Sequence, residues 1–106
     1  MAQQTKPEDP IYKIEKDVKA PRPISTPQPD FSVDARRGKV NGVVVVTGYI
    51  GTDGKFHDAK ILRSIGDSAL DSKVLHTVKK WTFHPCTRAD KPINCTMNIE
   101  TRIHLN

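Results

Sequence analysis

The sequence of 106 residues has few aromatic side chains, only two cysteines and no long hydrophobic run. Its longest purely apolar run, residues 43–46, is far shorter than the roughly 20 residues that a membrane-spanning helix needs. Aromatic residues make up 6% of the chain and do not alternate with basic ones, which argues against stacking on bases. We therefore expect a soluble protein without nucleic-acid partners. Its net charge of +5 favours acidic partners or serves solubility alone.

Signatures of catalysis and metal binding are missing as well. The chain has no glycine-rich phosphate loop, no Cys-x-x-Cys pair and no two histidines at helical spacing, since the histidines are scattered at His57, His76, His84 and His104. His84 and Cys86 lie two residues apart, but no oxyanion donor or orienting group stands near them. We expect no catalytic residue, no metal and no cofactor.

Glycine is absent before Gly38, whereas six of the eight prolines lie within the first thirty residues. Each proline pushes the residue before it towards extended geometry, so residues 1–30 are predicted to form an extended linker ahead of a domain at residues 31–106. A few apolar side chains offer contacts to the domain, but the pattern favours a frayed tail. No leader sequence precedes this segment, from which we expect the natural protein to be longer at its N-terminus and exported.

The strongest helix signal lies between residues 67 and 80. Its apolar residues recur at intervals of four, four and three, which places them on one face of a helix. Asp67 or Ser68 is suited to cap the first turn, with Asp71 at capping-box spacing from Ser68, and Pro85 forbids continuation. The core is predicted to contain this face and the residues after it, namely Leu70, Val74, Val78, Trp81 and Phe83.

Three segments have the character of strands. Residues 40–50 and 56–65 are predicted to pair as a hairpin, with Gly54 at positive φ in the turn between them. Residues 93–105 alternate apolar and polar side chains, which is typical of a strand with one wet face. With a short helical turn at residues 31–38, the sequence predicts an α+β two-layer sandwich: a three-stranded antiparallel sheet (β-β-α-β) with one main helix packed on one face.

Cys86 and Cys95 lie on either side of a segment that has the composition of a turn. Both neighbouring segments have strand character, so a disulfide across two strands is expected in an oxidising compartment. Two reduced thiols or a metal-binding pair are the alternatives.

A sheet of this size leaves edges unpaired, and the last strand is long and regular. Such an edge can accept an extended peptide through main-chain hydrogen bonds. The alternative, which the pattern alone favours, is that Glu100 and Arg102 only keep the edge soluble.

Residues 28–105 resemble the C-terminal domain of TonB, the periplasmic energy transducer of Gram-negative bacteria. The resemblance rests on the order and spacing of short motifs, which are Gln28-Pro29-Asp30-Phe31, Gly42 with the four valines after it, Asp53-Gly54, Leu70-Asp71, and Val78-Lys79-Lys80-Trp81-Thr82-Phe83 with Pro85. It covers about three-quarters of the chain. The sequence departs from the family at Phe31-Ser32, where Tyr-Pro is usual, and in its two cysteines.

The resemblance implies a periplasmic protein-interaction module that binds the box peptide of an outer-membrane TonB-dependent transporter. It also implies inner-membrane motor proteins as partners, through an N-terminal anchor that is missing from this sequence. The implied peptide-binding residues are Gln28, Pro29, Phe31, Met97, Asn98, Ile99, Glu100, Thr101, Arg102 and Ile103. The alternative function is a soluble periplasmic scaffold that forms a homodimer through its open sheet edge or binds the cell wall.

Overall fold

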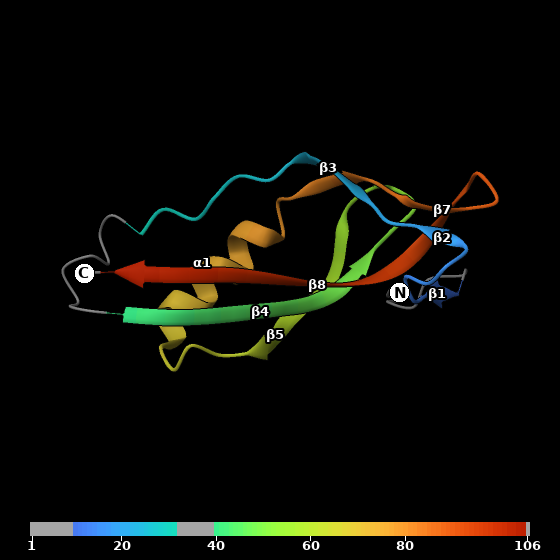
Figure 1. Cartoon of the computed structure of the whole chain (residues 1–106). Coiled ribbons are helices and arrows are strands. Elements are labelled where there is room, and N and C mark those ends of the chain that lie inside the picture. The colour runs from blue at the N-terminus through green and yellow to red at the C-terminus, as the bar shows by residue number, and fades with distance from the viewer. Residues whose placement is uncertain (1–9, 32–39, 106) are drawn as a thin grey trace, which may run out of the picture.

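A computed structural model describes residues 10–31 and 40–105 (Figure 1). Its elements in chain order are β1 (Ile11–Tyr12), β2 (Val18–Lys19), β3 (Arg22–Ser25), β4 (Val40–Ile50), β5 (Phe56–Arg63), α1 (Ser68–Val78), β6 (Thr82–His84), β7 (Cys86–Arg88) and β8 (Lys91–Leu105). The helical turn predicted for residues 31–38 lies outside the described residues, apart from Phe31. Within the described ranges, α1 is too short and too polar to cross a membrane.

Three long strands form the centre of the main sheet. β8 pairs antiparallel with β4 from Val40 opposite Leu105 to Ile50 opposite Cys95, and β5 pairs with the other edge of β4. In the turn between β4 and β5, Gly54 has φ of +79°, and a Cβ there would lie 2.2 Å from the carbonyl oxygen of Phe83. Glycine is therefore required at this turn for its backbone angle and for the close approach of β6.

The sheet is larger than the sequence predicted. The α+β class with one helix and antiparallel sheets is confirmed, but the expectation of three strands was wrong. The main sheet has six strands in the order β2-β7-β8-β4-β5, with β1 also paired to β8, and β3 and β6 form a separate two-stranded sheet. The additional strands are too short for a side-chain period to reveal them.

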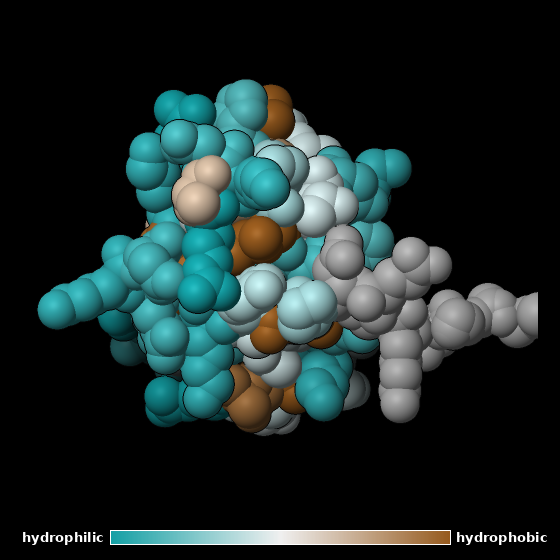
Figure 2. Space-filling model, turned by 90° about the vertical axis from the view of Figure 1, so that its right-hand side faces the viewer, coloured by the Kyte–Doolittle hydropathy of each residue, from teal (hydrophilic) through white to brown (hydrophobic). Residues whose placement is uncertain are grey.

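The proline-rich segment lies against the domain in its described part, residues 10–31. β1 runs parallel to β8 beside Asn94 and Cys95, β2 pairs with β7, and β3 pairs with β6. The expectation of a frayed tail was thus wrong for β1 to β3, because their pairing uses backbone groups that a side-chain pattern does not report. Figure 2 shows the end of the molecule that carries β1, β2 and β7 as largely hydrophilic, with hydrophobic side chains in separate patches.

Helix α1 begins at an aspartate cap. The Asp67 carboxylate accepts hydrogen bonds from the backbone N–H groups of Ala69 and Leu70, at 3.0 and 3.3 Å. Asp71 therefore stands one position beyond the capping-box site, and the role predicted for it was wrong. Its buried carboxylate instead accepts from the Ser64 hydroxyl and from the Ile65 N–H, which ties the loop before α1 to the helix.

The core lies between α1 and one face of the main sheet. Leu70, Val74 and Val78 of the helix are at most 1% exposed, and Phe83 of β6 is 4% exposed. They pack with inward residues of the central strands, which include Val44, Val46, Ile50, Ile99 and Ile103. Trp81 is only partly buried and packs against the edge of this cluster.

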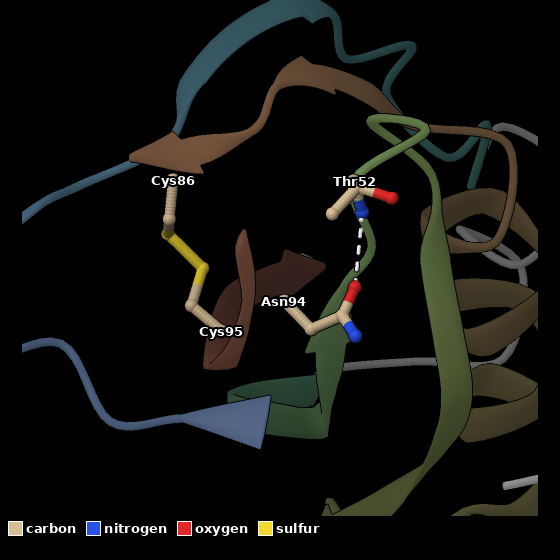
Figure 3. The surroundings of a disulfide bond; sticks show 4 residues. All are labelled: Thr52, Cys86, Asn94 and Cys95. Atoms are coloured by element: carbon tan, nitrogen blue, oxygen red, sulfur yellow. Dashed lines mark hydrogen bonds between the residues drawn. A yellow bond between two sulfur atoms is a disulfide. The ribbon is translucent and has the colours of Figure 1, made fainter. Parts of the chain in front are cut away.

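A disulfide joins β7 to β8 at one end of the sheet (Figure 3). Cys86 and Cys95 are both fully buried and their Cα atoms lie 6.2 Å apart, so the structure contains the disulfide rather than reduced thiols or a metal pair. Next to it, the side-chain oxygen of Asn94 accepts a hydrogen bond from the Thr52 N–H at 3.0 Å. The start of β8 is thus tied to both β7 and the β4–β5 turn.

Replacing Leu70 with alanine should destabilise the fold by about 2–5 kcal/mol, because this fully buried side chain would leave a cavity under the sheet. Chemical denaturation gives the free energy of unfolding. Leu62→Ala is the matched control, since Leu62 is 59% exposed and its loss should change stability by less than about 0.5 kcal/mol. Equal losses in the two variants would contradict the assigned core.

Replacing both Cys86 and Cys95 with alanine should lower the free energy of unfolding by about 2–3 kcal/mol, because the bond closes a short loop and restricts the unfolded chain. Dithiothreitol should destabilise the wild-type protein and leave the double variant unchanged. A wild-type protein whose unfolding does not respond to the reductant would refute a stabilising bond.

Candidate functional site

Within residues 10–31 and 40–105, one edge of β8 has no strand partner along most of its length. Cys95 has a strand partner on each side, Ile50 of β4 and Tyr12 of β1. Beyond it, residues 96–105 pair with β4 alone among the strands of residues 10–31 and 40–105. We call their unpaired side the free edge. Every second residue along it directs its backbone N–H and C=O away from β4, where another extended chain can pair with them.

Side chains along the free edge alternate between the two faces of the sheet. Ile99 and Ile103 are 6% and 1% exposed and face α1, with Met97 and Thr101 partly buried. Asn98, Glu100 and Arg102 are exposed on the opposite face. Here the Asn98 side-chain oxygen accepts a hydrogen bond from the Thr47 hydroxyl at 2.6 Å.

A groove of about 390 Å³ runs beside this edge. It is lined by consecutive β8 residues 97–100, by Trp81 and Phe83, and by Pro21, Pro23 and Thr26. Consecutive residues of a strand point to opposite faces, so a groove that touches four in a row follows the backbone edge itself. This arrangement offers main-chain hydrogen bonds on one side and a largely apolar wall on the other, which is the combination that strand addition uses.

The segment from Thr26 to Phe31 is held mainly by α1 and the residues after it. The Trp81 indole N–H donates to the Pro27 carbonyl oxygen at 2.7 Å, and the Lys73 ammonium donates to the Asp30 carbonyl oxygen at 2.9 Å. The same ammonium lies 5.8 Å from the centre of the Phe31 ring. Figure 1 shows this segment leaving β3 and passing along α1.

The implied site residues are therefore brought together only in part. Residues 97–100 line the groove, and Thr101, Arg102 and Ile103 continue the same edge. Gln28, Pro29 and Phe31 are not among the groove residues, and the Gln28 carboxamide donates to the Thr26 carbonyl oxygen. Sequence reasoning missed Pro21, Pro23 and Thr26, and assigned Trp81 to the core alone.

Two groups with shifted pKa values lie at the β4–β5 turn rather than in the groove. Burial raises the pKa of Tyr49, with smaller contributions from the nearby carboxylates of Asp58 and Asp53. Partial burial also acts to raise the pKa of Asp53, but hydrogen bonds from the Lys55 N–H and the His57 ring outweigh it and hold that pKa below its ordinary value. These contacts stabilise the turn.

Comparison with known proteins identifies the domain. The family model for the Gram-negative bacterial TonB protein C-terminal region matches residues 27–104. The chain belongs to the TonB C-terminal domain family. This family is a protein-interaction and energy-transduction module and not a known enzyme family. The match begins after Pro21 and Pro23, so these two groove residues lie outside it.

A curated relative and a solved structure agree with this assignment. Protein tonB2 of Pseudomonas aeruginosa is 26% identical over 83 residues, which are 78% of this chain and 31% of that protein. The chain thus spans less than a third of this relative. The solution NMR structure of the P. aeruginosa TonB C-terminal domain matches with a TM-score of 0.55 and 19% identity, covering 87% of this chain and 88% of that one. That match supports the fold.

Trp81→Phe should release the segment of residues 26–31 while keeping an aromatic ring beside the groove. The variant loses the indole donor to the Pro27 carbonyl oxygen, which should lower stability by about 0.5–1.5 kcal/mol. Hydrogen–deuterium exchange should accelerate at the amides of Gln28, Asp30 and Phe31. Lys80→Ala, one residue earlier and exposed, is the control. Unchanged exchange in Trp81→Phe would show that the indole does not hold this segment.

Proposed function

We propose that this domain is the periplasmic, peptide-binding end of a TonB-type energy transducer. It binds the box peptide of an outer-membrane TonB-dependent transporter by adding that peptide as a strand to the free edge of β8. The observation that carries this proposal is the unpaired edge at residues 96–105 with a groove running beside it.

The chain itself supports binding of an extended segment at this edge. β1 pairs with β8 through Ile11 beside Asn94 and Tyr12 beside Cys95, on the side of β8 that faces away from β4. The added peptide would continue along the same edge, from Thr96 onwards. A peptide need supply only extended backbone to gain hydrogen bonds there, because every second residue of β8 directs its N–H and C=O away from β4.

The structure suits transmission of force through such a peptide. β8 is paired with β4 over all eleven residues of β4 and is linked to β7 by the disulfide. A force along the added strand would act on several main-chain hydrogen bonds at once. It would be transmitted to the core rather than peel β8 away from β4. The motor is proposed to be a set of inner-membrane proteins that act through an N-terminal anchor.

A periplasmic location agrees with the disulfide, because such bonds persist in the oxidising bacterial periplasm and are rare in the cytosol. Coupling to a transporter and the periplasmic location are both inferred from the family, because the chain spans only part of its curated relative.

Titration of the isotope-labelled domain with a transporter box peptide from the same organism should give saturable shifts along residues 96–105. Two matched peptides carry N-methyl groups on one or the other set of alternate residues, because only every second N–H of an added strand points towards β8. One of the two should bind at least about tenfold more weakly if strand pairing carries the affinity.

Two results would contradict the proposal. If both methylated peptides bind as tightly as the unmethylated peptide, main-chain pairing is not the mode of binding. No shift at millimolar peptide, together with a dimer in sedimentation velocity, would show that a second copy occupies the edge and would favour the scaffold function.

A further inference from the structure

The pleat of β8 determines where the side chains of an added strand point. Neighbouring residues of paired strands project to the same face of a sheet. Met97 and Ile99 face α1, whereas Asn98 and Glu100 are exposed on the other face. A peptide residue beside Met97 or Ile99 therefore points inward, and the residues before and after it point outward.

The inward direction leads into the groove of about 390 Å³, where most of the lining is apolar. Trp81, Phe83, Pro21 and Pro23 stand around this space with the two inward β8 side chains. The Trp81 indole N–H, which is the strongest donor among these side chains, is already bonded to the Pro27 carbonyl oxygen. Asn98 and Glu100 also line the groove, but they are exposed on the opposite face of the sheet. A charged peptide side chain that points inward would therefore lose water without a charged partner on the inner face.

The wall opposite β8 comes from the N-terminal segment. Pro23 lies opposite Phe83 in the pairing of β3 with β6, and Pro21 is buried. Proline has no backbone N–H, so at these two positions the wall has no main-chain donor to offer a peptide. The wall thus contributes apolar surface, and hydrogen bonding is left to β8.

From this arrangement, and resting on the strand addition proposed above, we infer that the groove is a side-chain specificity pocket. It selects extended peptides with an uncharged, apolar residue at the position beside Met97 and Ile99. Pro21 and Pro23, which lie outside the family match, are specificity-determining residues of this pocket. Polar residues are accepted at the alternate positions, which face Asn98, Glu100 and Arg102.

The test uses strands tethered to the full chain, so that weak pairing is measurable. A short Gly-Ser linker after residue 106 is followed by a seven-residue strand of alternating valine and threonine, alternating lysine and threonine, or threonine alone. Tethering supplies an effective concentration in the millimolar range. Hydrogen–deuterium exchange at those alternate amides of residues 97–103 that point away from β4 reports the fraction of molecules in which the strand is paired.

The valine strand should protect these amides at least about tenfold more than the threonine or lysine strand, because it places an apolar side chain in the pocket. In Pro23→Asp, this preference for valine over lysine should disappear or reverse, since a carboxylate then faces the inward side chain. Ile24→Asp is the matched control. It changes the next residue of β3, which is 58% exposed and not part of the groove, and should keep the preference of the wild type.

The outcomes separate this inference from the function on which it rests. Equal protection by all three strands would overturn the pocket while leaving strand addition intact. An equal loss of preference in Pro23→Asp and Ile24→Asp would overturn the role of the proline wall. Protection by none of the strands would show that the free edge does not accept a strand, which would overturn both proposals. Thermal melts of each variant without a fused strand verify that it is folded.

Discussion

Most of this structure depends on the antiparallel pairing of β4 with β8. Its register places Val46 opposite Ile99 and puts Val44 and Ile103 on the same face, where α1 covers them. A shift by one residue would turn this whole set of side chains towards solvent. The helix can bury its apolar face only while this register holds. The disulfide and the contact of Asn94 with Thr52 secure the end at which β4 and β8 separate.

The same pairing creates the candidate site. β4 pairs with β8 from residue 95 to residue 105, so along this stretch additional chain can join β8 only on the other side. Short strands of this protein take the first part of β8, where β7 pairs with residues 91–93 and β1 with residues 94–95. Among the described residues, no strand pairs with the remainder of that side of β8. A bound strand would lie next to β8, on the side opposite β4. It would pass over the edge of the core, where Trp81 and Phe83 line the groove.

About half of this site could be predicted from the sequence. The regular alternation of residues 93–105 predicted a strand, because alternation is a local property of the chain, and the resemblance to the TonB family pointed to residues 97–103 within it. Pro21 and Pro23 could not be predicted, because nothing local shows that β3 returns to pair with β6 some sixty residues later. The spacing of Trp81 placed it on the apolar face of the helix. Its indole N–H, however, donates a hydrogen bond to the Pro27 carbonyl oxygen, and this contact depends on the path of a distant segment.

The amino-acid pattern alone specified α1 and the long strands β4, β5 and β8, and for α1 and β8 also the face that each buries. Repeated apolar positions at a period of 3.6 or 2 carry that information for α1 and β8, whereas β4 and β5 were indicated by residues typical of strands on either side of a turn. The tertiary structure decided the short strands, the placement of residues 10–31, and which edge of β8 stays open. These features arise from backbone pairing between distant segments, and backbone groups are the same in every residue except proline.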